Sequence, residues 1–147
     1  MTTNAVTATQ IKADPSRVYA ALTTEQGLTG WWSATADVGT RVGETIRFRW
    51  TDPDHTTMRI DLHELDRCVR WTCVEQSDRN LPQLDEWVGT VVQFDIAPSG
   101  DGCLLTVTHE GLLELACGEV CSRGWSSFMA GSLKPLVETG RGNPWSG

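Results

Sequence analysis

A change in the period of the hydrophobic pattern constrains this chain more than any other feature. Between residues 44 and 109, apolar and polar side chains alternate in short segments separated by turn residues. From about residue 115 to residue 138, apolar residues instead recur every three or four positions. Alternation is typical of strands with one buried face, and the longer period is typical of an amphipathic helix. The pattern therefore predicts an antiparallel sheet followed by one long helix.

The alternating part predicts a run of consecutive strands. In the segment ETIRFRW, for example, Ile46, Phe48 and Trp50 share one face. Ser-Gly-Asp-Gly at 99–102 is a hairpin signal, and the other segments are also separated by short polar connections or a longer one at 75–88. We therefore expect a meander with one apolar face. Its strands are predicted at residues 44–50, 56–65, 68–74, 89–97 and 103–109.

The two ends of the chain complete the predicted order. Residues 3–12 are rich in β-branched side chains, and Asp14-Pro15 is typical of a helix start, so a strand precedes a helix over 15–22. A second short helix is expected over 24–31. In the long helix we expect Pro135 to kink the last turn. The order is one strand, two short helices, about six strands and one long helix, which is an α+β fold. The helix residues expected to pack on the sheet are Val120, Trp125, Phe128 and Leu136.

Composition and charge exclude several classes of protein. Twelve Lys and Arg residues against nineteen Asp and Glu give a net charge of −7, with no basic cluster, so we expect no nucleic-acid partner. No apolar run is long enough to span a membrane, and the first fifteen residues lack the features of a secretory signal. Five cysteines without scaffold-like spacing favour a reducing compartment. We therefore expect a single cytoplasmic domain over residues 1–147.

Four segments resemble one known family. IKADPSRVYAALT is similar to its strand-to-helix entry, and GLTGWWS follows with a tryptophan pair. EWVGTVVQFDIAPSGDGCLLTVTHEGL resembles its paired strands, which end in a His-x-Gly step, and CSRGWSSFMAGSLKPLVETGRG is similar to its C-terminal helix. These segments resemble the branch of the START/Bet v 1-like (SRPBCC) superfamily named after the activator of Hsp90 ATPase homologues (AHSA1-like). The resemblance implies the helix-grip fold, a curved antiparallel sheet around a long C-terminal helix.

The resemblance leaves three functions open. Proteins with this fold include lipid carriers, hormone receptors and cyclases, and the eukaryotic members of the branch are co-chaperones. We expect a protein that binds a small apolar or aromatic molecule, as a monomer or a homodimer, without cofactor or metal ion. The alternatives are a cofactor-free cyclase or hydrolase that uses the same cavity, and a co-chaperone-like interaction module.

Seven tryptophans beside one tyrosine point to a candidate ligand site. Large rings on the inward faces either fill a core or line a pocket, and each ring alone is compatible with both interpretations. We expect an internal cavity of roughly 300–1,000 Å³, the usual size of a small-molecule site. The residues expected to bind the ligand are Trp32, Phe48, Trp50, Met58, Ile60, Trp71, Trp87, Phe94, His109, Trp125, Phe128 and Met129.

His109 is the candidate for acid–base chemistry. Alternation places it on the inward face with Leu105 and Val107, near the start of the long helix. A buried imidazole without an anionic partner stays neutral at pH 7 and offers one donor and one acceptor. The alternative is a histidine whose hydrogen bonds serve only the core.

Cys117 and Cys121 are the remaining candidates. They lie four residues apart, on one face of the expected helix. Two thiols are too few for a zinc site, and a disulfide along a regular helix has poor geometry. Buried apolar cysteine is the simpler interpretation.

Overall fold

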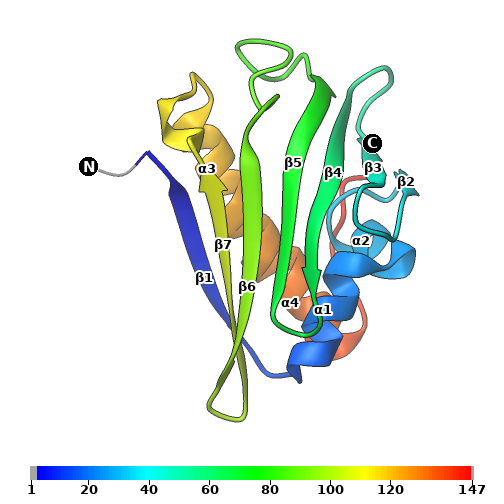
Figure 1. Ribbon diagram of the computed structural model, residues 1–147, viewed down its shortest axis with the longest axis vertical. Coiled ribbons are helices and arrows are strands. Elements are labelled where there is room, and N and C mark those ends of the chain that lie inside the picture. The colour runs from blue at the N-terminus through cyan, green and yellow to red at the C-terminus, as the bar shows by residue number, and fades with distance from the viewer. Residues whose placement is uncertain (1–2, 147) are drawn as a thin grey trace.

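Seven strands form one antiparallel sheet in the order β1-β7-β6-β5-β4-β3-β2, and helices cover one of its faces (Figure 1). The computed structural model describes residues 3–146, and it confirms the α+β helix-grip fold. The strands are β1 (Ala5–Ile11), β2 (Ala36–Val38), β3 (Thr45–Arg49), β4 (His55–Glu64), β5 (Cys68–Ser77), β6 (Val91–Ser99) and β7 (Gly102–Glu110). The helices are α1 (Pro15–Thr23), α2 (Glu25–Trp31), η1 (Leu112–Glu114), α3 (Gly118–Phe128), η2 (Met129–Leu133) and α4 (Lys134–Thr139).

Most of the predicted strands lie where the alternation places them. The predicted hairpin joins β6 to β7, with Ser99 paired to Gly102 and Gly100 in the left-handed region at φ 60°. The strand that no pattern located is β2, a three-residue strand that pairs with β3 at the sheet edge. Alternation cannot be recognised over three residues, so this strand follows only from its partner.

The C-terminal helix is continuous but changes geometry. It begins at Gly118 rather than near residue 115, because the short 3-10 turn η1 comes first. Five residues, Met129–Leu133, form a π-helical turn between α3 and α4. Pro135 is the second residue after this turn, where its missing N–H and its ring oppose regular α-helical hydrogen bonding to the residues before it. The irregularity therefore lies one turn before the expected kink, and the last turn is the regular helix α4.

The prediction for Val120 was wrong. Its side chain is 64% exposed, whereas Trp125 and Met129 are buried against the sheet. At 3.6 residues per turn, five positions correspond to a rotation of about 140°, so Val120 cannot share the face of Trp125. Cys121 and Cys117 lie four and eight positions before Trp125, and they take the place on the sheet-facing stripe instead.

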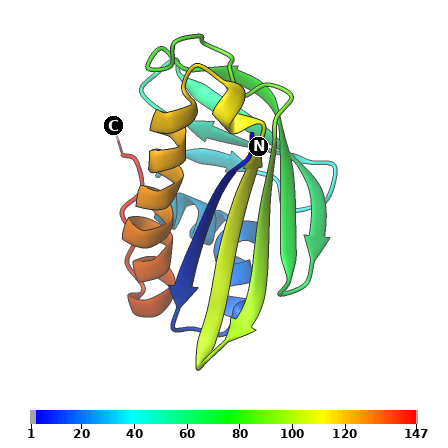
Figure 2. The same ribbon diagram turned by 90° about the vertical axis from the view of Figure 1, so that its left-hand side faces the viewer.

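The core lies between the sheet and the helices. Figure 2 shows α3 and α4 along the face of the sheet that the helices cover. In this view α1 and α2 lie behind β1 and β7, near the lower end of the sheet. Trp31, Phe48, Trp71 and Phe94 are among the largest fully buried side chains. In residues 3–146 no helix is both long and apolar enough to cross a membrane.

Candidate functional site

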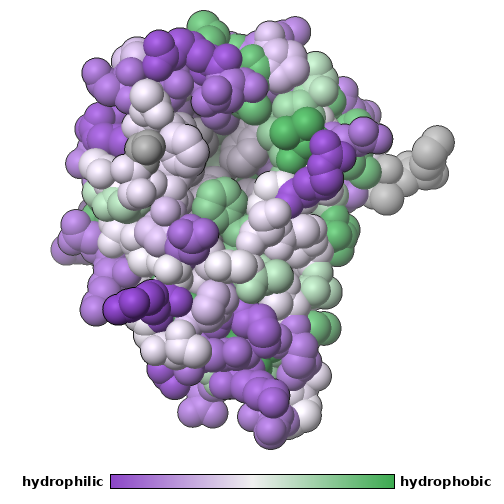
Figure 3. Space-filling model, turned by 180° about the vertical axis from the view of Figure 1, so that it is seen from behind, coloured by the Kyte–Doolittle hydropathy of each residue, from purple (hydrophilic) through white to green (hydrophobic). Residues whose placement is uncertain are grey.

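A pocket of about 230 Å³ lies between α3, the 78–88 connection and the C-terminal tail. It opens to the surface, and Figure 3 shows the hollow in the upper part of the face seen from behind. The expected cavity was larger and internal, so the structure corrects both its size and its enclosure. The lining residues are Trp32, Trp50, Thr56, Gln76, Asp78, Asn80, Leu81, Trp87, Val120, Cys121, Gly124, Trp125, Phe128 and Trp145.

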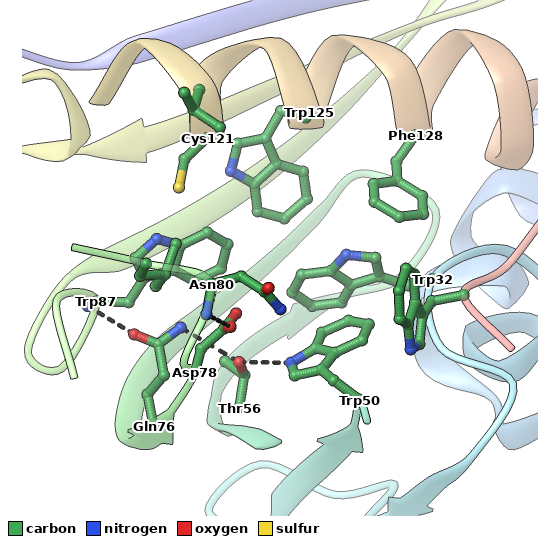
Figure 4. A pocket seen from close by; sticks show the side chains of 14 residues that line it. Trp32, Trp50, Thr56, Gln76, Asp78, Asn80, Trp87, Cys121, Trp125 and Phe128 are labelled. Carbon is green, nitrogen blue, oxygen red and sulfur yellow. Dashed lines mark hydrogen bonds between the residues drawn. The ribbon is translucent and has the colours of Figure 1, made fainter. Parts of the chain in front are cut away.

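Tryptophan rings form most of the apolar wall (Figure 4). The Trp32 ring lies at the centre, with its centroid 5.2 Å from that of Trp125 and 5.5 Å from that of Trp50. Trp87 stacks against both Trp32 and Trp125, with centroid distances of 6.2 Å and 5.9 Å. Rings in mutual contact restrict one another, so the wall is held in shape before any ligand arrives.

Two buried polar side chains hold the floor of the pocket. The Trp50 indole N–H donates to the Thr56 hydroxyl oxygen at 2.9 Å, and the Gln76 amide donates to the same oxygen at 3.2 Å. The Gln76 carbonyl oxygen accepts the backbone N–H of Trp87 at 2.9 Å. Figure 4 shows this chain of hydrogen bonds beneath the rings. It links β4 and β5 to the connection that carries Trp87.

His109 lies behind the wall rather than on it. It is fully buried on β7, as the alternation predicted, but it is not among the lining residues. The Trp125 indole N–H donates to His109 Nδ1 at 3.0 Å, and since an indole only donates, the ring proton is on Nε2. That Nε2–H donates to the Thr90 hydroxyl at 2.8 Å, which in turn donates to the Trp87 carbonyl oxygen at 2.6 Å. Both ring nitrogens are thus engaged within the protein.

Burial determines the charge of this histidine. Desolvation lowers the pKa of His109 to about 3, so the ring is neutral at pH 7, as expected. The expectation that its donor and acceptor are available to a ligand was wrong, because Trp125 and Thr90 occupy them. The network instead holds the Trp125 ring directly and the Trp87 backbone through Thr90, and the His109 ring packs edge-on against the Trp87 ring with a centroid distance of 4.7 Å.

The structure divides the predicted ligand-binding residues into two groups. Five of them line the pocket: Trp32, Trp50, Trp87, Trp125 and Phe128. The others lie in the packed core outside the lining, and each is no more than 1% exposed: Phe48, Met58, Ile60, Trp71, Phe94, His109 and Met129. This differs from the expected convergence around a cavity, because the rings of Trp32, Trp31 and Phe94 fill the space above the sheet centre.

Sequence reasoning missed several lining residues for identifiable reasons. Thr56 has the same alternation as Met58 and Ile60, so a polar side chain at this position was a detectable signal. Gln76 was not detectable, because Val74 is an extra residue that reverses the alternation of β5. Trp145 lies in a tail without periodicity. The other lining residues missed are Asp78, Asn80, Leu81, Val120, Cys121 and Gly124.

Hydrogen bonds and an ion pair hold the tail and the 78–88 connection in place beside the pocket. The Ser132 hydroxyl donates to the Trp31 carbonyl oxygen at 2.6 Å and accepts the Asn143 N–H at 2.8 Å. The Trp145 N–H then donates to the Trp32 carbonyl oxygen at 2.8 Å, which places the tail beside the pocket. On the opposite wall, Arg79 anchors the connection to the buried carboxylate of Asp54 by a 3.1 Å ion pair.

Cys117 and Cys121 are free thiols, and Cys121 lines the pocket. Their sulfurs lie 2.7 Å apart, with Cys121 donating to Cys117. Burial raises the pKa of both thiols, so they are protonated at pH 7 and weak as nucleophiles or metal ligands. Within residues 3–146, no cluster of three or more His, Cys, Asp or Glu side chains could hold a metal ion.

Known proteins match this chain in family and in fold. The family model described as Activator of Hsp90 ATPase homolog 1-like protein matches residues 12–138. The solution structure of the Aha1 dimer from Colwellia psychrerythraea is 27% identical and superposes with a TM-score of 0.80 over 95% of this chain and 98% of that chain. No curated protein matches the chain.

Two further structures share the fold at lower identity. A crystal structure of a protein from Staphylococcus saprophyticus is 17% identical, with a TM-score of 0.73 over 95% of each chain. The crystal structure of DynU16, from the dynemicin biosynthetic locus, is 18% identical, with a TM-score of 0.71 over 95% of this chain and 48% of that chain. The match of the family model spans most of the sequence, and the chain therefore belongs to the family of Activator of Hsp90 ATPase homolog 1-like proteins.

Proposed function

We propose that this protein binds a small apolar or aromatic molecule in the tryptophan-lined pocket. One observation carries the proposal: Trp32, Trp50, Trp87, Trp125 and Trp145 come from five separate segments and line one pocket. Concave sites with apolar walls and a few fixed polar groups are typical of small-molecule binding. A volume of about 230 Å³ suits a ligand of one or two rings.

The hydrogen bonds behind the wall favour binding over catalysis. His109, the candidate acid or base of the cyclase or hydrolase alternative, has both ring nitrogens engaged with Trp125 and Thr90. Proton transfer to a substrate would require breaking one of these buried hydrogen bonds. We therefore assign His109 a positioning role, in which it orients the Trp125 indole by a hydrogen bond and supports Trp87 by ring packing and through Thr90.

A library of lipids and small aromatic compounds tests the proposal. Ligand binding should quench tryptophan fluorescence and raise the melting temperature, since a ligand that binds only the folded state stabilises it. Gly124→Leu supplies the variant, because Gly124 lines the pocket and a Cβ atom there would meet no protein atom within 4 Å. Ala130→Leu is the matched control, since Ala130 is exposed on the same helix.

The expected result is stabilisation of the wild-type protein and of Ala130→Leu, with loss of binding in Gly124→Leu. A library that stabilises none of the three proteins refutes the proposal. Equal binding by Gly124→Leu would place the ligand elsewhere.

The family match favours a second candidate function, a co-chaperone-like interaction. The matching model is described as an activator of Hsp90 ATPase homologue, and the Aha1 relative is a dimer in solution. Purified Hsp90 from the same organism, mixed with this protein, tests this function by its ATPase rate. An increase that persists in Gly124→Leu would support the interaction module over the pocket.

The same proposal treats residues 1–147 as one domain in the cytoplasm. All five cysteines are free, which supports a reducing compartment. We keep monomer and homodimer as the two states to distinguish by light scattering.

A further inference from the structure

The pocket wall combines aromatic faces with one negative charge. Five indoles, the Phe128 ring and Asp78 line the same pocket. Among the residues that the structure describes, no lysine or arginine lines the pocket. The chain as a whole carries a net charge of −7. A neutral apolar ligand has no need of the carboxylate, whereas an anionic ligand would be repelled by it.

Aromatic faces attract cations. The ring quadrupole places negative charge over the face, and tryptophan gives the strongest attraction for a cation within about 6 Å of the ring centroid. Around the pocket, the Trp32 indole contacts those of Trp50, Trp87 and Trp125, and Trp87 also stacks on Trp125. A compact group in this space therefore contacts several rings at once, and their attractions act together.

Asp78 is held beside these rings. It directly follows β5 and is half-buried, and its Oδ1 accepts the Asn80 backbone N–H at 2.9 Å. Figure 4 shows Asp78 and Asn80 between Gln76 and the aromatic side chains. One neutral hydrogen bond does not cancel the charge, so the carboxylate is available to a cation in the pocket.

The neighbouring arginine does not neutralise Asp78. Arg79 turns the other way: its Nε lies 3.1 Å from Asp54 Oδ1, and its Nη2 donates to the Asp52 carbonyl oxygen at 3.1 Å. The two neighbouring charged side chains therefore point in different directions. Arg79 binds the turn between β3 and β4, and Asp78 lines the pocket.

We propose that the ligand of this pocket is a compact organic cation, a quaternary or N-methylated ammonium joined to an apolar group. This inference rests on the proposed function and names the class of its ligand. Methylated nitrogen suits the site better than a primary amine does, because N-methyl groups pack on ring faces and need no hydrogen-bond acceptors. Asp78 supplies the counter-charge, and the indoles of the wall supply the faces.

Pairs of isosteric compounds test the charge alone. Phenyltrimethylammonium and tert-butylbenzene have the same shape and differ in the central atom and its charge, and choline and 3,3-dimethyl-1-butanol form a second pair. Binding is measured by tryptophan fluorescence and calorimetry at low salt. We expect each ammonium compound to bind at least about tenfold more tightly than its carbon isostere.

Two variants locate the preference. Asp78→Asn keeps an oxygen that accepts the Asn80 N–H, so the fold should be retained and the preference for the cation should fall severalfold. Asp101→Asn is the matched control, since it removes the same charge at the hairpin between β6 and β7. Trp145→Leu keeps an apolar wall without a ring face, so it should weaken the ammonium compound more than its isostere.

The outcomes separate the two proposals. If a carbon isostere binds as tightly as its ammonium partner, the proposal of a cationic ligand is refuted. The proposal of an apolar ligand site is then unaffected. The same conclusion follows if neither member of a pair binds while neutral library compounds do. If no compound of any class binds, both proposals fail. An unchanged preference in Asp78→Asn overturns the role of the carboxylate.

Discussion

Replacing His109 should remove a large part of the acid sensitivity of this fold. The imidazole is fully buried, and burial lowers its pKa to about 3, from the ordinary value of 6.5. As the pH falls through about 6.5, the unfolded chain takes up a proton on this residue, whereas the folded chain does not until about pH 3. The unfolded state therefore binds more protons in this window, and stability is lost as the pH decreases.

The magnitude follows from the two pKa values. Between pH 7 and pH 5, one such histidine lowers the free energy of unfolding by about 2 kcal/mol. His109→Phe lacks the titrating group, so its loss of stability over this interval should be about 2 kcal/mol smaller than that of the wild-type protein. At pH 7 the same variant should be less stable by about 1–3 kcal/mol, because the buried Trp125 N–H loses its acceptor.

Urea unfolding of both proteins at pH 7 and pH 5 measures the two effects. All other ionisable groups are identical in the two proteins, so their contributions cancel in the comparison. His109→Gln serves as a second variant, since its amide has no charge to gain but retains a donor and an acceptor. If wild type and variants lose the same stability between the two pH values, the imidazole titrates freely in the folded state and its assigned burial is wrong.

Three further variants test the packing around the pocket. Trp125→Ala should lower the free energy of unfolding by about 3–5 kcal/mol, since it empties a buried ring position; an unchanged melting temperature would contradict the assigned packing. Ser132→Ala should lower the free energy of unfolding by about 1–3 kcal/mol, because it leaves the Trp31 carbonyl and the Asn143 N–H without their partner. It should also speed amide hydrogen exchange in the C-terminal tail. Exchange rates equal to those of the wild type would show that other contacts hold the tail. Arg79→Ala should lower the free energy of unfolding by about 1–2 kcal/mol, less than for a fully buried ion pair, because the Arg79 side chain is 56% exposed. It should also speed amide hydrogen exchange over residues 78–88. Protection there as strong as in the wild type would refute the anchoring role of Arg79.

Local pattern determined the framework of this protein. Alternation located the strands that carry Phe48, Trp71 and Phe94, and it placed His109 on the inward face. Asp14-Pro15 marked the start of α1, and Pro135 indicated an irregular C-terminal helix, although the irregular turn precedes the proline. These features depend on residues close together in sequence, because backbone periodicity and proline geometry act over one or two turns.

Only the tertiary structure decided which of the inward residues form a site. The bulge at Val74 turns Gln76 inward, and Val120 faces outward because it lies five positions before the buried Trp125. Trp145 reaches the pocket because Ser132 holds the tail 11 residues further along, at Asn143. Whether a buried ring fills the core or lines a pocket depends on which distant side chains meet above it. That outcome is set by packing between segments far apart in the chain, and no local period encodes it.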